Sequence, residues 1–201
     1  MPDEKPKKPS VVHIITRLEP GGSSRNVADS CAAQAADFDV TLIYGPHPAA
    51  ASLLGLLPEG VKRVEARHLR REISPAADIL ALLEIKAQLS AIRPDIVHTH
   101  TSKAGALGRA AAALCNFRSP KRSIVVHTPH GHLLYGYYGP LRTALFRCIE
   151  RLLALVTDRF VALTPGEARE SAAAGIGRQR DWTVVHSGVD LRPPEKPASK
   201  A

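Results

Sequence analysis

Short β-branched runs alternate along the chain with longer segments rich in alanine and leucine. The short runs are apolar at nearly every position, which is typical of strands in a sheet covered on both faces. The longer segments predict helices, and Ser74 and Pro75 can serve as the cap and the first turn of one of them. We expect strands at 11–16, 39–45, 61–66, 96–100, 123–128, 158–163 and 182–188, and helices at 25–36, 74–92, 104–115, 141–156 and 165–175.

Strands that alternate with helices form right-handed crossovers and hence parallel sheets. The pattern therefore predicts an α/β fold over residues 11–190: a Rossmann-like open parallel β-sheet with helices on both faces. Residues 1–10 are charged and rich in proline, and we expect a disordered basic arm there. Residues 191–201 are rich in proline and lysine without apolar periodicity, which favours a linker.

Composition narrows the class of protein. A chain of 201 residues, 44% hydrophobic and 23% charged, is long enough for one well-buried core. No apolar run approaches the roughly 18–20 residues that span a bilayer. Three widely spaced cysteines without a CxxC motif favour free thiols in a reducing cytoplasm.

The net charge of +8 favours an anionic partner: nucleic acid, a phosphorylated metabolite or an acidic membrane surface. Nucleic acid fits poorly, because aromatic residues are few and no recognisable binding module is present. We expect no nucleic-acid partner.

Histidines gather where ligands bind in open parallel sheets, at the carboxyl ends of the strands. This clustering favours a binding or catalytic role over a purely structural one. His13, His47 and His68 are interpreted as ordinary strand and loop residues. Six of the nine histidines end a predicted strand or follow one: His98, His100, His127, His130, His132 and His186.

The turn "PGGSS" lies between the first strand and the first helix. Gly21 and Gly22 let the backbone approach a ligand closely, and the helix N-terminus beyond them offers free N–H groups to an anion. The same residues also suit a tight turn between a strand and a helix that binds no ligand. They are not the GxGxxG fingerprint of dinucleotide-binding proteins, so a nicotinamide-dependent enzyme is disfavoured.

The segment "HTHTSKAGALGR" repeats this arrangement after the fourth strand. Thr101 or Ser102 can cap the helix, and Lys103 adds a positive charge. Phosphate or sugar hydroxyls suit this corner, and so does an ordinary capped helix with a solvated lysine.

The loop "HTPHGH" supplies three histidines that could bind a metal. Neither a neighbouring carboxylate nor a cysteine accompanies them, so we favour imidazole and backbone donors for a polar ligand, with Gly131 permitting the path of the loop. The amphipathic segment 141–156 carries arginines beside leucines. Contact with an anionic membrane is one interpretation, and we favour a helix that faces the core.

Five stretches in this order resemble the N-terminal domain of the family-4 glycosyltransferases, retaining enzymes built from two Rossmann-like domains (the GT-B architecture). The stretches are "HIITRLEPGGSSRNV", "RPDIVHTHTSKAGALGR", "VVHTPHGH", "TDRFVALTPGEAR" and "VVHSGVD". The last one has Ser187-Gly188 where the family often has Asn-Gly.

The resemblance implies transfer of a sugar from a nucleotide-sugar donor, without a metal or other cofactor. It implies that His130, the expected catalytic residue, contacts the donor sugar near the reacting carbon. Gly21 and Gly22 would approach the donor diphosphate and the acceptor, and His100 and Lys103 would lie beside the acceptor and the donor phosphates. Thr101 and Gly131 complete the expected donor- and acceptor-binding residues.

The family's second domain, which binds the nucleotide, would begin where this sequence stops. We therefore expect an acceptor-side domain that is inactive in isolation. We expect it to be cytoplasmic, and peripheral contact with the inner face of an anionic membrane is left open. The expected partners are a glycan or lipid-linked acceptor and the C-terminal domain. Two alternatives remain: a non-catalytic subunit that completes a site with a separate chain, and a histidine-rich metal-binding domain.

Overall fold

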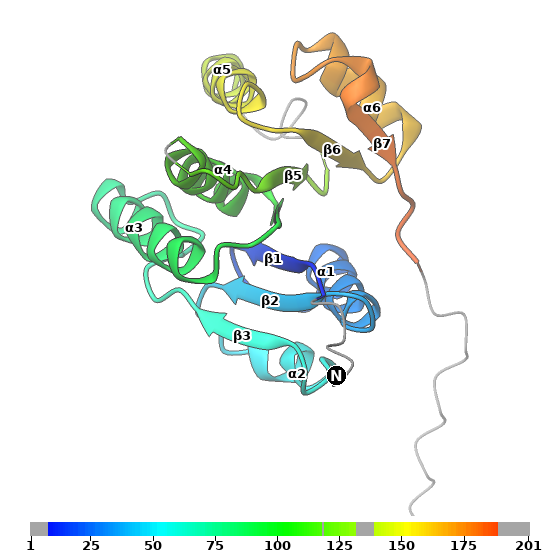
Figure 1. Ribbon diagram of the computed structural model, residues 1–201. Helices are drawn as coiled ribbons and strands as arrows, with labels where there is room; N and C mark the ends of the chain where they lie inside the picture. Colours follow the sequence, from blue (N-terminus) through cyan, green and yellow to red (C-terminus); the bar gives the residue numbers. More distant parts are fainter. Residues whose placement is uncertain (1–7, 118, 132–138, 189–201) are drawn as a thin grey trace, which may run out of the picture.

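The computed structural model describes residues 8–117, 119–131 and 139–188. Within them, seven strands form one parallel sheet in the order β3-β2-β1-β4-β5-β6-β7, which confirms the predicted α/β class (Figure 1). The strands are β1 (Ser10–Ile15), β2 (Asp39–Tyr44), β3 (Lys62–Glu65), β4 (Ile96–His100), β5 (Ile124–Thr128), β6 (Arg159–Ala162) and β7 (Trp182–Val184).

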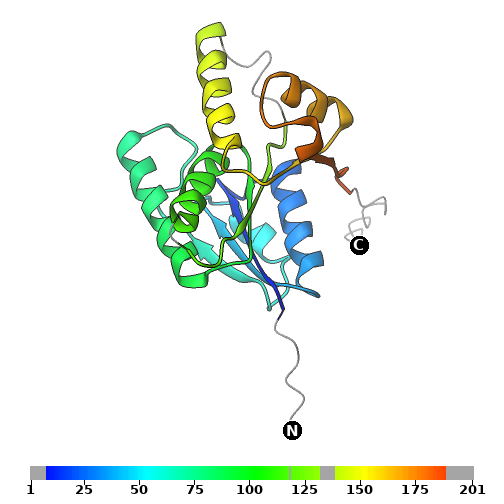
Figure 2. The ribbon, with the colours of Figure 1, turned by 45° about the horizontal axis from the view of Figure 1, so that its top comes forward.

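Helices connect the strands and cover both faces of the sheet. Figure 1 shows α3, α4 and α5 along one side of the sheet and α1 and α6 along the other, an arrangement that the rotated view in Figure 2 supports. The helices are α1 (Gly22–Gln34), α2 (Ala50–Leu54), α3 (Pro75–Ile92), α4 (Ser102–Asn116), α5 (Pro140–Ala154) and α6 (Pro165–Ala173), with a 3-10 turn at Gln179–Asp181.

The strand order reverses beside β1. The chain runs outward from β1 through β2 to β3, then crosses back to place β4 on the other side of β1. Because crossovers leave on opposite sides at this point, the carboxyl ends of β1 and β4 form the crevice where open α/β sheets bind ligands.

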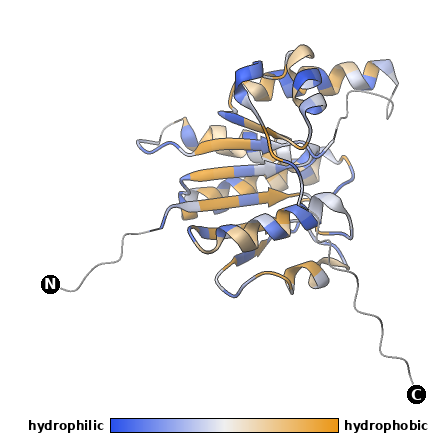
Figure 3. Ribbon diagram, turned by 90° about the vertical axis from the view of Figure 1, so that its right-hand side faces the viewer, coloured by the Kyte–Doolittle hydropathy of each residue, from blue (hydrophilic) through white to orange (hydrophobic). Residues whose placement is uncertain are grey.

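Two apolar layers hold the sheet, one on each face. Val11, Ile15 and Leu42 pack with α1 and α2, whereas Val12 and Ile14 pack with α3 and α4. This alternation follows from the strand period of two, and the strands are accordingly apolar along most of their length (Figure 3). A smaller third cluster joins β6, β7 and α6.

Local details differ from the sequence expectations. The helix α2 was not expected, and α1 and α4 begin at Gly22 and Ser102, one turn or less before their predicted starts. Ser74 and Pro75 occupy the predicted N-cap and first-turn positions of α3, but the Ser74 side chain makes no capping bond; instead the carboxylate of Asp78 accepts from the Ser74 N–H at 3.2 Å. The expected linker 191–201 and most of the expected arm 1–10 lie outside the described residues.

The prediction that 141–156 faces the core is also wrong. No residue of α5 is buried within the described part of the chain. Its helical spacing places four leucines on one face, which we call the leucine stripe, and they are 59% to 84% exposed. The stripe consists of Leu141, Leu145, Leu152 and Leu155. None of the helices in the described residues has the length and hydrophobicity that crossing a bilayer requires.

Candidate ligand site at the β1–β4 edge

A pocket of about 450 Å³ opens at the carboxyl ends of β1 and β4. Its walls come from the β1–α1 turn and from the facing parts of α3, α4 and α5, and none of the histidines in 8–117, 119–131 and 139–188 lines it. The lining combines apolar and charged side chains: Ile15, Thr16, Arg17, Glu19, Ser23, Ser24, Arg71, Ile73, Asp78, Thr101, Ser102, Lys103, Ala106, Leu107, Phe146, Ile149 and Glu150.

The two glycines of the β1–α1 turn have open space around them, and Glu19, Ser23 and Ser24 beside them line the pocket. A Cβ added at Gly22 would meet nothing within 4 Å, and one at Gly21 would meet only the Glu19 carbonyl oxygen, at 4.0 Å. Gly21 has φ 164°, an extended conformation that any residue adopts, so the glycines contribute room and not conformational freedom. No side chain caps the start of α1 among the described residues, so its first N–H groups are available to an anion.

The start of α4 is held by a residue from another strand. Thr16, which follows β1, accepts a hydrogen bond from the Ala104 N–H at 3.1 Å, and its hydroxyl lies 3.1 Å from that of Thr101. The expected capping by Thr101 or Ser102 is therefore wrong. Thr101 has φ 61°, a strained conformation for a β-branched residue, at the point where β4 turns into the pocket.

Lys103 lines the pocket but is already paired. Its ammonium group lies 2.5 Å from Asp78 Oδ1 and also donates to the Glu72 carbonyl oxygen. Arg17 is likewise paired with Glu19 at 2.7 Å. Among the charged residues that line the pocket, only Arg71 is a cation without an ion pair to another described residue, and it is exposed to solvent.

On the opposite face of the sheet, beneath α1, four histidines meet. His13 Nδ1 lies 2.9 Å from His100 Nε2, and His100 Nδ1 lies 2.9 Å from His130 Nε2. The His98 ring is tilted by 36° against that of His100, with ring centroids 4.1 Å apart, and bonds Thr128. The interpretation of His13 as an ordinary strand residue is wrong, because His13 belongs to this cluster and contacts its central member, His100.

The register of the sheet explains this cluster. His13 of β1 pairs with His98 of the adjacent β4, and His98 and His100 lie two residues apart, so all three point to the same face. Burial removes the imidazoles from water and lowers the pKa of His13 and of His130 to about 4. Burial also lowers the pKa of His98 and of His100 well below the usual value. All four are therefore neutral at pH 7.

The loop that carries His130 is fixed by a buried carboxylate. Glu167 at the start of α6 accepts from the Gly131 N–H at 3.1 Å and from the Leu163 N–H at 2.7 Å. His130 itself has φ 59°, a conformation that needs such support. Sequence reasoning missed Glu167, because nothing in a helix-forming segment indicates that its carboxylate reaches a loop more than thirty residues earlier.

The other histidines that the structure describes do not join the cluster. His127 lies on the other face, under α4, where its ring bonds Thr99 at 2.9 Å. A Cβ at Gly105 would lie 2.4 Å from this ring, so the α4 glycine makes the close packing possible. His186 bonds the Leu163 carbonyl oxygen at the edge of the sheet, and His132 lies outside the described residues.

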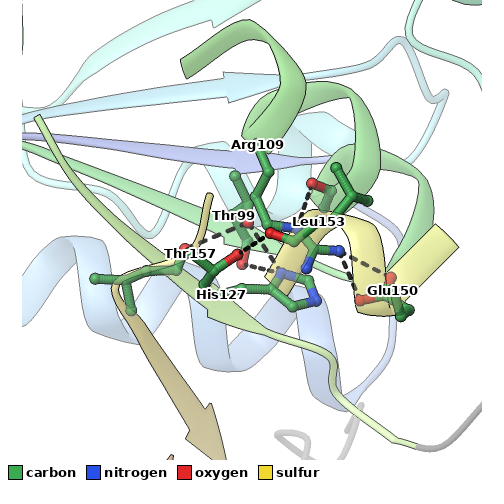
Figure 4. A network of polar contacts seen from close by, with 8 residues as sticks. Thr99, Arg109, His127, Glu150, Leu153 and Thr157 are labelled. Atoms are coloured by element: carbon green, nitrogen blue, oxygen red, sulfur yellow. Dashed lines mark hydrogen bonds and ion pairs between the residues drawn. The ribbon is translucent and has the colours of Figure 1, made fainter. Parts of the chain in front are cut away.

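A buried ion pair ties α5 to the sheet. Arg109 of α4 is fully buried and donates two hydrogen bonds of 2.8 Å to the Glu150 carboxylate of α5, beside His127 (Figure 4). Neither residue was expected to matter. No residue of α5 is buried in the described part of the chain, and this pair attaches the helix to α4, while Arg151 donates to the Ala174 carbonyl oxygen after α6 at 2.7 Å.

The metal hypothesis can be tested on this geometry. One ring nitrogen each from His13, His98 and His100 lies within 4.8 Å of the others, which is the spacing of a candidate metal site. However, His13 and His100 already bond each other directly, and a metal between them would have to break that bond. Of the histidines of "HTPHGH", the disfavoured metal ligands of the sequence analysis, His127 and His130 are not in this group, and His132 lies outside the described residues.

The fold and this edge define a Rossmann-like domain of the kind found in two-domain sugar-handling enzymes. Residues 20–192 match the model of Glycosyltransferase Family 4. The chain belongs to that family, as the sequence resemblance predicted.

Comparisons with individual proteins agree with this placement. A curated relative from Escherichia coli, "UDP-Gal:alpha-D-GlcNAc-diphosphoundecaprenol alpha-1,3-galactosyltransferase", is 32% identical over 157 residues, 77% of this chain and 38% of the relative. The lipopolysaccharide outer core galactosyltransferase WaaB matches with a TM-score of 0.65 at 15% identity, over 95% of this chain and 50% of WaaB.

A UDP-N-acetylglucosamine 2-epimerase from Rickettsia bellii has the same fold, with a TM-score of 0.65 at 13% identity over 90% of this chain and 45% of the epimerase. The solved structures therefore show the fold alone, and the family match is what separates a transferase from an epimerase. The chain spans half or less of the length of these relatives.

Proposed function

We propose that this chain is the acceptor-side domain of a retaining glycosyltransferase that moves a sugar from a nucleotide-sugar to a lipid-linked or otherwise phosphorylated glycan. The family match over residues 20–192 carries the proposal. The Escherichia coli relative, named for a UDP-galactose donor and a diphosphoundecaprenol-linked acceptor, supports a diphospholipid as the acceptor.

The donor would bind across the carboxyl ends of β1, β4 and β5. Gly21 and Gly22 leave room for its diphosphate at the start of α1, and His130 and Gly131 would contact the sugar. Negative charge builds on the leaving diphosphate during transfer, so N–H donors and cations aimed at it stabilise the transition state. We propose no metal or other cofactor, and transfer should therefore persist in a chelator such as EDTA.

The 450 Å³ pocket suits the acceptor. Its apolar wall, with Phe146 and Ile149, fits the start of a lipid chain, and the unpaired guanidinium of Arg71 fits a phosphate. Lys103 would serve here mainly by holding Asp78, with its own charge already neutralised. Replacing Arg71 with Met should raise the acceptor KM about tenfold, whereas Arg70→Met, on the adjacent exposed residue outside the pocket, should leave it unchanged.

A second, nucleotide-binding domain would close the site. We propose that it faces the edge that carries Gly22 and His130, and that the chain alone transfers sugar very slowly because this wall of the cleft is supplied by the other domain. The cleft of such enzymes excludes water, which strengthens the interactions with the developing charge.

The test joins this chain to the C-terminal part of the Escherichia coli relative and supplies UDP-galactose with a GlcNAc-diphospholipid. Transfer should appear in the joined protein, fall at least a hundredfold in His130→Ala, and remain in the partly buried control variant His68→Ala, whose ring pairs with Glu84 outside the site. Vigorous transfer by the chain alone would refute its dependence on the second domain. Transfer that needs the second domain as a separate chain would favour the two-subunit alternative, and stoichiometric zinc in the purified protein would favour the metal-binding one.

We further propose that the protein is cytoplasmic and rests on the inner face of an anionic membrane through α5. The leucine stripe offers an apolar face, and the exposed Arg142 and Arg147 flank it, an arrangement that suits acidic headgroups. Phe146 and Ile149 of the same helix line the pocket, so a lipid-linked acceptor could pass from the bilayer into the site along α5.

Sedimentation with vesicles tests this contact. The chain should bind vesicles of mixed phosphatidylcholine and phosphatidylglycerol and lose about tenfold in affinity on replacement of Leu145 and Leu152 with Ser. The matched control replaces Leu83 and Leu114, leucines of similar exposure on α3 and α4, and should bind like the wild type. Equal loss in both variants, or binding that is indifferent to salt, would contradict the role of α5.

A further inference from the structure

One continuous chain of hydrogen bonds runs from the far end of α1 to the loop after β5. Gln34 Oε1 lies 2.8 Å from His13 Nε2, His13 Nδ1 lies 2.9 Å from His100 Nε2, and His100 Nδ1 lies 2.9 Å from His130 Nε2. His13 and His100 use both of their ring nitrogens in this chain. Each of these hydrogen bonds joins two of the side chains directly.

Each link constrains the next. A neutral imidazole carries one N–H donor and one acceptor nitrogen, and all three imidazoles of the chain are neutral at pH 7 because burial lowers their pKa. Once the proton of one ring is assigned, the protons of the others follow. Only two arrangements of the whole chain exist, and they place the proton of His130 on opposite nitrogens.

We propose that Gln34 and His13 are positioning residues that hold the proton of His130 on Nε2 and leave its Nδ1 as a hydrogen-bond acceptor. The Gln34 carbonyl oxygen accepts from His13 Nε2–H, which makes His13 Nδ1 the acceptor for His100 Nε2–H. His100 Nδ1 in turn accepts from His130 Nε2–H.

The other end of the chain is open. His130 Nδ1 is buried and has no hydrogen-bond partner among the described residues. An unpaired acceptor in a buried position is costly unless a ligand supplies the donor. A hydroxyl group of a bound sugar is such a donor. This choice of ligand rests on the proposed function, whereas the position of the proton does not.

The proposal separates two kinds of control over His130. Glu167 holds the backbone of the loop, through the Gly131 N–H, and so sets where the ring lies. The histidine chain sets whether the open nitrogen of the ring, Nδ1, accepts or donates a hydrogen bond. Gln34 therefore influences the chemistry of a site that it does not touch.

¹⁵N NMR of the protein labelled with ¹⁵N-histidine tests the proposal without any substrate. At pH 8, His13, His100 and His130 should each carry the proton on Nε2. Couplings across the hydrogen bonds should join His13 Nδ1 to His100 Nε2 and His100 Nδ1 to His130 Nε2. A proton on Nδ1 of His130, or the absence of these couplings, would overturn the proposal.

The matched variants are Gln34→Met and Gln88→Met, which replace two partly buried helical glutamines. Gln34→Met removes the acceptor that sets the direction of the chain, so the Nε2–H fraction of His130 should fall toward one half. The affinity of a ligand that donates to Nδ1 then falls about twofold, because only the competent fraction binds. Gln88→Met should leave the proton on Nε2.

An unchanged His130 in Gln34→Met would show that the proton is set locally and would refute the relay. The outcome is independent of the proposed function. If the protons lie on the predicted nitrogens but His130→Ala does not slow sugar transfer, the proposed proton arrangement stands and the proposed function of His130 is refuted.

Discussion

Acidification should destabilise this fold well before its carboxylates titrate. His13 is fully buried with a pKa of about 4, against 6.5 when it is exposed in the unfolded chain. Between pH 6.5 and pH 4 the His13 side chain is protonated in the unfolded state and neutral in the folded state. The free energy of unfolding therefore has its full value above pH 6.5 and decreases as the pH falls toward 4. At pH 5 the loss for His13 is about 2 kcal/mol.

His130, with the same pKa of about 4, adds about 2 kcal/mol, and His98 and His100 act in the same direction. A loss of about 4 kcal/mol between pH 8 and pH 5 corresponds to a fall in Tm of about 8–16 °C for a chain of this size. Such a loss is a large part of the stability of a typical domain.

The assay is urea unfolding followed by circular dichroism from pH 8 to pH 5. The variant His13→Gln should unfold more easily at pH 8, but its free energy of unfolding should fall about 2 kcal/mol less on acidification. Val125→Ala, which removes buried volume and no titrating group, should be less stable by about 2 kcal/mol at every pH, with a curve parallel to that of the wild type. A pH dependence in His13→Gln as steep as in the wild type would refute the reasoning.

Two further predictions concern packing on the α4 side of the sheet. Arg109→Met should lower the free energy of unfolding in urea by about 3 kcal/mol, because it leaves the Glu150 carboxylate unpaired in a largely buried position. Arg122→Met, at an exposed ion pair, should lower it by less than about 1 kcal/mol. Equal losses in the two variants would mean that α5 is held by other contacts. Gly105→Ala should cost about 1–3 kcal/mol because its Cβ would lie 2.4 Å from the His127 ring, whereas Gly60→Ala, with open space around it, should change the unfolding free energy by less than about 0.5 kcal/mol.

The sequence predicts this fold closely because the strands are buried on both faces. The boundaries of β4, predicted at 96–100, agree with the structure, and those of α3 differ by one residue. Apolar runs of strand length between capped helical segments leave few alternatives. The helix α2 was missed because five residues flanked by prolines carry too little periodicity to be recognised.

The candidate site was only partly predictable, for a different reason. The position of Gly22 and His130 at strand ends follows from local order along the chain. The role of His13 depends on the register between β1 and β4, and the exposure of the leucine stripe depends on what covers α5. Both are long-range properties, and a local pattern reports which face a residue occupies but not what lies against it.

The carboxylate of Glu167 has a consequence for the order of events during synthesis. The loop with His130 is anchored by a residue that leaves the ribosome more than thirty positions later. A nascent chain that has emerged only as far as α5 can already pair β1 with β2 and β4, and β4 with β5, but it still lacks the carboxylate that holds the His130 loop. Maturation of the ligand-facing edge is therefore deferred until α6 has docked.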